Sequence, residues 1–517
     1  MKNSLRLALV LLILISTSCS LPTVTTASAP TLVMVTVPPN ASPTSTPFQP
    51  SGVFPSEATT LIPSFTPLPS TNTPLPTLAF TATSLPPQTS APPSARTQYT
   101  LHALLDYAGH QLAVDETIRY TNQTGVALGE LVLAVEPNLR GGFTLENIML
   151  NGTALTYDLS GQQLTVPLPQ SLAPGAQVTL TMRFRIDLPS KIKEHPYGYD
   201  VDQVNLTDWY PFVVPYSNGW ILHEPGALGE HLVYDAADFE VNIKTTTTDV
   251  VIAASGLADS EPNGEWTRYR LTGARTFAFS ASDQLLYYDA TSGAAQIRSY
   301  YFPGYETQGA AVLNAAVRSV GIYEAKFGPY PYGSLSIVQA DLNDGQEYDG
   351  LVFLATQFYN QYDGSARSNL VAIGVHEIAH QWWFGLVGSD QAMEPWLDEA
   401  MCIYSEAIFY KFIYPNSLDW WWNFRVNYFG PSGYVDSNIY EHPTFRSYVN
   451  AAYLNGANFM EALNYRMGDD AFYAFLQDYT TRYGRSRATS YDFFAVARQH
   501  TTADISDLIA AYFRGSY

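Results

Sequence analysis

Two histidines and a glutamate stand inside a long apolar stretch, and they constrain the local structure more than any other feature of the sequence. They are His376, Glu377 and His380, spaced as His-Glu-x-x-His. In an α-helix, residues four apart lie about 40° apart around the axis and one turn apart along it, so both imidazoles can face one metal ion. Glu377 then lies beside the two histidines but off their line. Apolar residues on both sides of the motif predict a helix that is buried on most of its surface.

A pattern this short can also arise by chance. The chain has 9 histidines among 517 residues, and composition alone gives the pattern in roughly one such sequence in a hundred or fewer. The alternative is a buried helix whose histidines are ordinary core residues. The position of a third ligand separates the two interpretations.

A catalytic zinc ion needs three protein ligands and one position open to water. In the metzincin arrangement, Gly would follow His380 by three residues and a third His by six, but these positions hold Trp383 and Leu386, which excludes that arrangement. Glu399 lies nineteen residues beyond His380, in a second predicted helix, and the loop between them is long enough to turn the chain back antiparallel. We therefore expect His376, His380 and Glu399 to bind one zinc ion per chain.

This spacing resembles the aminopeptidase N and leukotriene hydrolase family of gluzincin metallopeptidases, in which the third ligand lies within Trp-Leu-Asn-Glu. Here the segment is Trp396-Leu-Asp398-Glu399, so Asp398 stands where the family usually has Asn, beside a metal ligand. The resemblance implies that Glu377 is the general base that takes a proton from the attacking water. It also implies a thermolysin-like, mainly α-helical catalytic domain that follows a β-rich N-terminal domain.

The acidic stretch 341–351 bears on the substrate. A calcium loop starting at its first residue would need Gly at the sixth position and Glu at the twelfth, which hold Gln346 and Val352, so that interpretation fails. The family resemblance aligns this stretch with the exopeptidase motif Gly-x-Met-Glu-Asn. It assigns Glu347 to the α-ammonium group of the peptide, with Gln346 beside it in the substrate-binding site. Asp344 replaces the first Gly and Gln346 the Met, so the edge of the pocket differs from the family. The alternative is a solvated acidic turn.

Tyr453 precedes Gly456 and a predicted helix, which resembles the Tyr-x-Lys-Gly segment of the family with Asn455 in place of Lys. The resemblance implies that the Tyr453 hydroxyl stabilises the oxyanion of the reaction. Because the chain has 36 tyrosines, packing is the alternative role for any one of them.

The remaining periodicity predicts a multidomain α+β fold. Residues 97–302 alternate apolar and polar side chains between Gly-containing turns, which predicts a β-sandwich or saddle domain. Residues 303–517 are predicted to form the catalytic domain, and they begin with an amphipathic helix over 310–327. In the family the β-rich domain closes one wall of the substrate cleft, which would bring Asp202 or Gln203 near the bound amine.

The N-terminus resembles a secretory signal. Residues 1–19 comprise a basic start, an apolar run and small residues before Cys19. Cys19 falls where a bacterial lipoprotein signal carries its lipidated cysteine, although Ser16 stands where Leu is usual. We expect a lipid anchor in the membrane at Cys19, with ordinary cleavage and release as the alternative. Residues 20–96 are rich in Ser, Thr and Pro and nearly free of charge, which predicts a disordered stalk.

A net charge of -21 argues against nucleic acid as a partner and favours solubility or cationic substrates. We therefore expect an extracytoplasmic zinc aminopeptidase, either a cell-surface lipoprotein or secreted, that acts on peptides with a free N-terminus. Two other functions stay open: a zinc-bearing binding or scaffold protein without turnover, and a hydrolase of a non-peptide substrate on the same site. We also expect no counterpart of the large C-terminal helical domain of many relatives, and hence a more open cleft.

Overall fold

The first strands of the β-rich half alternate buried and exposed side chains. The computed structural model describes residues 96–259 and 265–517. The predicted signal segment with Cys19, and all but the last residue of the predicted stalk, lie outside the described residues. In β1 (Gln98–Asp106) and β2 (Gln111–Thr121) every second residue is buried, as expected for strands with one face against a core.

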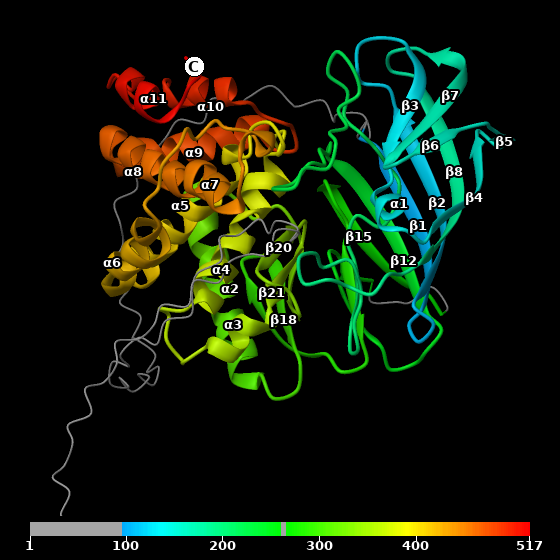
Figure 1. Ribbon diagram of the computed structural model, residues 1–517, viewed down its shortest axis with the longest axis horizontal. Helices are drawn as coiled ribbons and strands as arrows, with labels where there is room; N and C mark the ends of the chain where they lie inside the picture. Colours follow the sequence, from blue (N-terminus) through cyan, green and yellow to red (C-terminus); the bar gives the residue numbers. More distant parts are fainter. Residues whose placement is uncertain (1–95, 260–264) are drawn as a thin grey trace, which may run out of the picture. The chain divides into compact units, whose positions relative to one another are not determined.

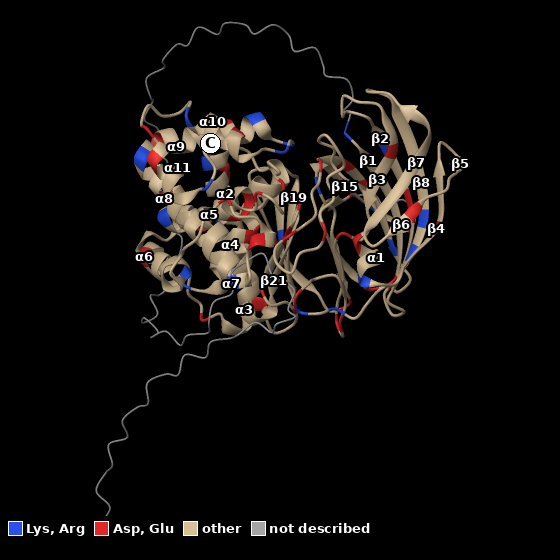
Figure 2. Cartoon of the chain, turned by 45° about the horizontal axis from the view of Figure 1, so that its top comes forward, with Lys and Arg blue, Asp and Glu red and all other residues tan. Residues whose placement is uncertain are grey.

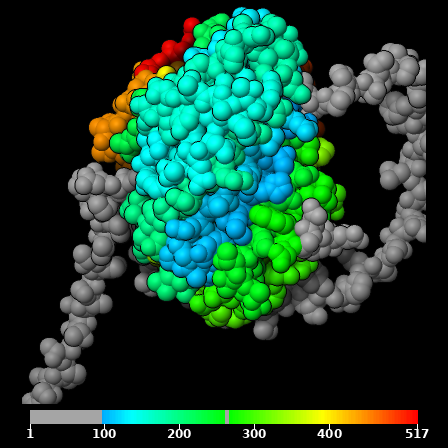
Figure 3. All heavy atoms as spheres, turned by 90° about the vertical axis from the view of Figure 1, so that its right-hand side faces the viewer, coloured from blue at the N-terminus to red at the C-terminus, as the bar shows by residue number. Residues whose placement is uncertain are grey.

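The β-rich half contains one large sheet and two small ones (Figure 1). The large sheet has the order β14-β15-β12-β1-β2-β8-β4-β5, and β1 pairs with β12 in parallel. Its other strands are β4 (Phe143–Leu150), β5 (Thr153–Ala154), β8 (Gln177–Asp187), β12 (Ala237–Thr245), β14 (Leu257–Ala258) and β15 (Thr267–Ala274). In Figure 3 the first strands, in blue and cyan, cover most of the outer face of this half.

The two small sheets have the orders β13-β16-β10-β9 and β11-β3-β7-β6. Their strands are β3 (Leu128–Ala134), β6 (Asp158–Ser160), β7 (Gln163–Leu172), β9 (Gly198–Tyr199), β10 (Val204–Leu206), β11 (Phe212–Val213), β13 (Val251–Ala254) and β16 (Phe279–Ser282). A short helix, α1 (Glu136–Arg140), follows β3.

The catalytic half begins with a five-stranded sheet of order β17-β18-β19-β21-β20. Its strands are β17 (Leu286–Ser292), β18 (Ala295–Tyr301), β19 (Ser334–Ala340), β20 (Gly345–Tyr348) and β21 (Leu351–Ala355). Because β18 pairs in parallel with β19, the sheet of the catalytic half starts near residue 285 rather than at 303. Sequence periodicity does not reveal this boundary, because β17 and β18 are also strands and follow those of the β-rich half without a helix between them.

Helices make up the rest of the catalytic half, and the predicted helix over 310–327 lies within the first of them. They are α2 (Glu306–Phe327), α3 (Thr356–Gln361), α4 (Asn369–Ala379), α5 (Trp396–Ile413), α6 (Leu418–Trp421), α7 (Phe445–Tyr448), α8 (Gly456–Met467), α9 (Asp469–Tyr483), α10 (Ser490–Ala497) and α11 (Ser506–Tyr512). Shorter helical turns cover Gln381–Leu386, Pro415–Ser417, Trp422–Val426, Asn427–Phe429, Ile439–Glu441 and Val449–Asn455. The predicted multidomain α+β fold is confirmed. Within the described residues, no helix combines the length and apolar character needed to cross a membrane.

A buried arginine fastens the two halves together. The Arg275 side chain, at the end of β15, donates hydrogen bonds to the backbone carbonyls of Phe384 (2.6 Å) and Ser486 (2.6 Å) in the catalytic half. Asp349 accepts from the backbone N–H groups of Arg275 (2.9 Å) and Thr276 (2.7 Å). A buried guanidinium without such partners would be costly, so these bonds fix the β-rich half beside the segment that follows α4.

Glu116 breaks the alternation of β2, because it occupies a core-facing position that the pattern reserves for an apolar side chain. It is 1% exposed, and neither carboxylate oxygen has a hydrogen-bond partner in the part of the chain that the structure describes. Burial therefore raises the pKa of Glu116 well above its ordinary value.

We expect Glu116→Leu to raise the free energy of unfolding by about 1–4 kcal/mol, with the larger gain at high pH. The unfolded chain ionises Glu116 above about pH 4.3, whereas the native state keeps the proton. The wild type therefore loses stability as pH rises from that value towards the native pKa, and the leucine variant does not. Melting temperatures at pH 5 and pH 8, with the exposed Glu130→Gln as control, test this. An equal gain at both pH values would contradict it.

Candidate active site

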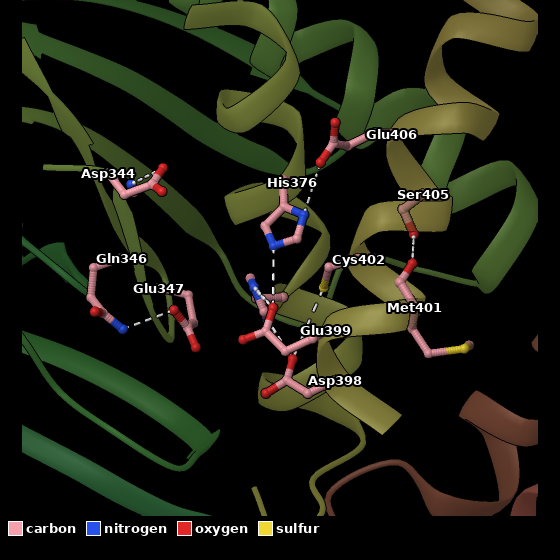
Figure 4. A network of polar contacts seen from close by, with 12 residues as sticks. Asp344, Gln346, Glu347, His376, Asp398, Glu399, Met401, Cys402, Ser405 and Glu406 are labelled. Carbon is pink, nitrogen blue, oxygen red and sulfur yellow. Dashed lines mark hydrogen bonds and ion pairs between the residues drawn. The ribbon is translucent and has the colours of Figure 1, made fainter. Parts of the chain in front are cut away.

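The two histidines lie at the end of α4, and Glu399 faces them from the first turn of α5. The Nε2 atoms of His376 and His380 lie 3.4 Å and 3.7 Å from Glu399 Oε2. Figure 4 shows His376 and Glu399 pointing toward one another from the two helices. Tyr323 connects these helices, since its hydroxyl lies within hydrogen-bond distance of the carbonyl oxygens of Val375 (3.1 Å) in α4 and Ser405 (3.0 Å) in α5. The structure therefore brings the three predicted ligands together.

The Nε2 atoms of His376 and His380 and Oε2 of Glu399 are arranged so that they could bind one divalent metal ion. They lie within 4.8 Å of one another, and none has a hydrogen-bond partner among the described residues, although all three are buried. Buried polar atoms without partners are rare in native proteins, so the group points to a ligand. Burial lowers the pKa of both His376 and His380 to about 4, which keeps the imidazoles neutral and able to donate to a metal at neutral pH. Two imidazoles and a carboxylate form a donor set of catalytic zinc sites.

Carboxylates orient both imidazoles by contacting their Nδ1 atoms, on the opposite side of each ring from Nε2. His376 Nδ1 lies 3.0 Å from Glu406 Oε1, and His380 Nδ1 lies 2.5 Å from Asp398 Oδ1. A carboxylate at Nδ1 favours the tautomer that leaves the Nε2 lone pair free for a metal. Asp398, singled out from the sequence, thus supports a histidine as well as adjoining Glu399. Sequence reasoning missed Glu406, although it lies seven residues after Glu399 and therefore on the same face of α5.

Glu406 is itself held in a buried cluster. Its Oε2 accepts hydrogen bonds from Arg425 Nε (2.9 Å) and Trp421 Nε1 (2.8 Å). Burial alone would raise its pKa, but Arg425 and the hydrogen bond with His376 hold the pKa of Glu406 below its ordinary value. The carboxylate is therefore ionised at neutral pH and accepts the Nδ1 proton of His376.

The predicted base and oxyanion donor border the same space. Glu377 is fully buried, and one of its oxygens lies within 4.8 Å of ligand atoms of His380 and Glu347. Tyr453 lies in the helical turn Val449–Asn455, with its ring parallel to that of His376 at a centroid distance of 6.5 Å. Burial and the neighbouring Glu399 carboxylate raise the pKa of Tyr453 well above its ordinary value. Its hydroxyl therefore keeps its proton and can donate a hydrogen bond.

Glu347 and Gln346 lie on the edge strand β20 and connect the two halves. Gln346 Nε2 donates to Glu347 Oε2 (2.9 Å) and to Glu230 Oε1 (2.5 Å), and Glu230 comes from the β-rich half. Gln391 Nε2 donates to the other Glu230 oxygen (2.5 Å) and to Asp398 Oδ2 (2.8 Å). A continuous polar chain thus runs from Glu347 to the carboxylate that supports His380.

Acidic groups crowd this region. Oxygens of Glu230, Glu347 and Glu399 lie within 4.8 Å of one another. Burial raises the pKa of Glu347 well above its ordinary value, and the carboxylates of Glu230 and Glu377 raise it further. Figure 2 shows acidic segments, in red, beside α4 and α5. The arrangement is suited to two cations, one at the histidines and one at Glu347.

The β-rich half contributes a different residue from the ones expected. Gln203 donates to Ser280 Oγ (3.0 Å) and to the backbone carbonyl of Gln339 (3.0 Å), and Asp202 accepts from Gln284. Glu230 takes the place beside Glu347. Sequence reasoning did not find Glu230, because this residue lies in a loop without regular structure before β12. Such a loop has no helical or strand periodicity in its sequence, so the sequence does not show which of its residues lies at the site.

Comparison with known proteins identifies the catalytic half. Residues 311–512 match the Peptidase family M1 domain. This part of the chain is therefore similar to the catalytic domain of that peptidase family. Aminopeptidase M1-D of Oryza sativa subsp. japonica is 25% identical over 243 residues, which cover 43% of this chain and 27% of the relative. The puromycin-sensitive aminopeptidase of Caenorhabditis elegans is 21% identical over 383 residues, which cover 69% of this chain and 40% of the relative. The chain thus spans about a quarter of the length of the rice relative.

A solved structure shares the fold of both halves. The M1 zinc metallopeptidase from Deinococcus radiodurans matches with a TM-score of 0.62 at 19% identity, over 82% of this chain and 94% of that chain. A mutant of that metallopeptidase, bound to a Tyr-ser-ala substrate, matches with a TM-score of 0.59 at 19% identity over the same shares. The combination of a β-rich half with an M1 domain is therefore a known architecture.

We expect Asp398→Ala to weaken zinc affinity by about 10–100-fold, because His380 loses the acceptor that orients it. Asp398→Asn should have a much smaller effect, since the amide oxygen can still accept from His380 Nδ1. Competition with a chromogenic chelator, together with the zinc content after dialysis, measures both. Wild-type affinity in the alanine variant would show that Asp398 does not orient the ligand.

Proposed function

We propose that this protein is a zinc-dependent aminopeptidase that removes residues from the N-terminus of peptides. One observation supports this most strongly: two carboxylates from different halves, Glu347 and Glu230, share a hydrogen-bonded network with Asp398, beside the ligand set. A fixed pair of carboxylates beside the reacting centre suits an α-ammonium group. The names of the relatives and of the solved M1 zinc metallopeptidases agree with this activity.

The chain supplies the groups that peptide hydrolysis requires. Zinc, when bound by His376, His380 and Glu399, supplies Lewis-acid polarisation of water and of the scissile carbonyl. Glu377 removes a proton from the attacking water and then delivers it to the leaving nitrogen. The Tyr453 hydroxyl donates a hydrogen bond to the carbonyl oxygen as that oxygen gains negative charge.

The amine subsite accounts for the preference for chain ends. Glu347 and Glu230 pair with the α-ammonium, and the amide groups of Gln346 and Gln391 hold them in place. An internal peptide bond brings no cation to this position. Its binding would leave the buried carboxylates uncompensated, which is unfavourable.

We further propose that the enzyme works outside the cytoplasm, held by a lipid on Cys19 or released after cleavage. The support is the composition of residues 1–19, which lie outside the described part of the chain. Fractionation of cells that express the full chain tests this, and recovery with the cytosolic proteins would exclude it.

We expect Glu377→Gln to keep zinc and to lose about two to four powers of ten in kcat, because the amide cannot accept the proton of the attacking water. Zinc content and hydrolysis of an unblocked aminoacyl amide, each with a chelator control, measure the two properties separately. Full activity in the variant would refute the assignment of the base. A wild type that binds zinc and hydrolyses no peptide would instead favour a binding protein or a non-peptide substrate.

We expect Glu347→Gln to lower kcat/KM for unblocked peptides by about tenfold or more, because a hydrogen bond to a charged group contributes about 1.5–3 kcal/mol. Cleavage of N-acetylated peptides of the same sequence should change far less. The exposed Glu130→Gln serves again as the control. An equal loss on free and blocked peptides would argue for an endopeptidase.

A further inference from the structure

A cavity of about 270 Å³ opens beyond the amine subsite, toward the β-rich half. Strand β20, Phe384 and Gln391 form one part of its wall, and most of the other lining residues come from α1 and from the loops around β10 and β12. Glu230 and Gln391 also line a small hollow that Asp398 and Glu399 border. Glu230 therefore stands between the metal ligands and this cavity.

The position of the cavity fits the first side chain of a bound peptide. The α-carbon of that residue carries both the ammonium group and the side chain, and it also leads to the scissile carbonyl. With the ammonium at Glu347 and Glu230 and the carbonyl toward the histidines, the side chain must leave in a third direction. The same two carboxylates line the cavity, whereas neither His376 nor His380 is among its lining residues.

The cavity is acidic. Four carboxylates line it, from Glu136, Asp208, Glu230 and Glu347, against the single guanidinium of Arg140 among the lining residues. Two histidines also face it: burial lowers the pKa of His195 well below its ordinary value, which keeps that ring neutral, and His231 Nε2 lies 3.0 Å from Gln162 Oε1. The α-ammonium of a substrate and Arg140 would together offset two of the four carboxylates, and two would remain.

Two of these carboxylates are built into the wall away from the amine subsite. Glu136 is 4% exposed, its Oε1 accepts from Arg140 (3.0 Å), and its Oε2 lies 3.5 Å from His231 Nε2. Asp208 accepts a hydrogen bond from the Tyr234 hydroxyl (2.7 Å) at Oδ1. Its backbone φ is 49°, in the left-handed region. This conformation is energetically unfavourable for a residue other than glycine, so contacts with the surrounding structure must stabilise it.

We propose that this cavity binds the side chain of the first residue of the peptide and selects a basic one, lysine or arginine. The proposal rests on the aminopeptidase function above and names its substrate class. A long side chain that ends in a cation reaches past Glu230 and pairs with Asp208 and Glu136. A neutral side chain would leave the carboxylates of the cavity in excess of its cationic groups.

Lysyl and norleucyl 4-nitroanilides test the preference, because the two substrates differ only in the terminal ammonium. For the zinc-loaded full chain, we expect kcat/KM for the lysyl substrate to exceed that for the norleucyl substrate by about tenfold or more. This is the increase expected from one additional charge-assisted hydrogen bond to the substrate. The arginyl substrate should behave like the lysyl one. Lysine amide should likewise inhibit more strongly than norleucine amide, and this comparison requires no variant.

Asp208→Asn should lower the lysyl-to-norleucyl ratio of kcat/KM by about tenfold. The amide keeps the shape of the side chain and an acceptor for Tyr234, and asparagine tolerates the left-handed backbone. Glu130→Gln, which removes an exposed carboxylate from the same half, should leave the ratio unchanged. A melting temperature close to that of the wild type confirms that Asp208→Asn folds.

The outcomes separate this inference from the proposed function. Hydrolysis of the norleucyl substrate as fast as the lysyl one would overturn the basic preference and leave the aminopeptidase activity intact. An unchanged ratio in Asp208→Asn would overturn the assignment of Asp208. Absence of hydrolysis of all unblocked substrates by the zinc-loaded wild type would overturn the proposed function itself.

Discussion

The site depends on a group of carboxylates that the protein holds close together, four of them buried and that of Glu230 half-buried. Glu230, Glu347, Glu377, Asp398 and Glu399 are all near the reacting centre, and burial and mutual repulsion raise the pKa values of Glu347 and Glu399 well above ordinary ones. Such a cluster is unfavourable without positive charge inside it. A divalent metal and the ammonium group of a substrate are the two cations that the geometry accommodates. Recognition of both therefore follows from the same electrostatic condition.

The glutamine amides make this cluster possible. Gln346 bridges Glu347 and Glu230, and Gln391 bridges Glu230 and Asp398, in each case with one amide nitrogen that donates to both carboxylates. A neutral donor between two acceptors reduces their repulsion without cancelling the charge that a substrate needs to meet. This explains how Gln346 serves at a position where the related exopeptidases usually have methionine, which has no such donor.

Helical periodicity and the family resemblance anticipated the residues on α4 and α5, because their spacing alone sets which face they share. The same periodicity would have pointed to Glu406. Glu230, Gln391 and Asp208 lie in loops, and no local pattern shows where such residues end up in a folded chain. The apolar residues after His380 suggested that the buried helix continues beyond the motif. Instead α4 ends at Ala379, and Trp383 and Phe384 depart from helical backbone angles. The tertiary contacts of Arg275 with Phe384, which no local pattern predicts, hold this departure in place.

The bonds of Arg275 have a consequence for the behaviour of the whole molecule. Its guanidinium binds backbone carbonyls of the catalytic half, so separation of the halves would leave a buried cation and several carbonyl groups without partners. The β-rich half is therefore held rigidly against the site by these hydrogen bonds, in contrast to a domain that moves on a flexible hinge. A partially unfolded form with one half intact would be poorly populated, and loss of either half would remove the proposed amine subsite in the same cooperative step.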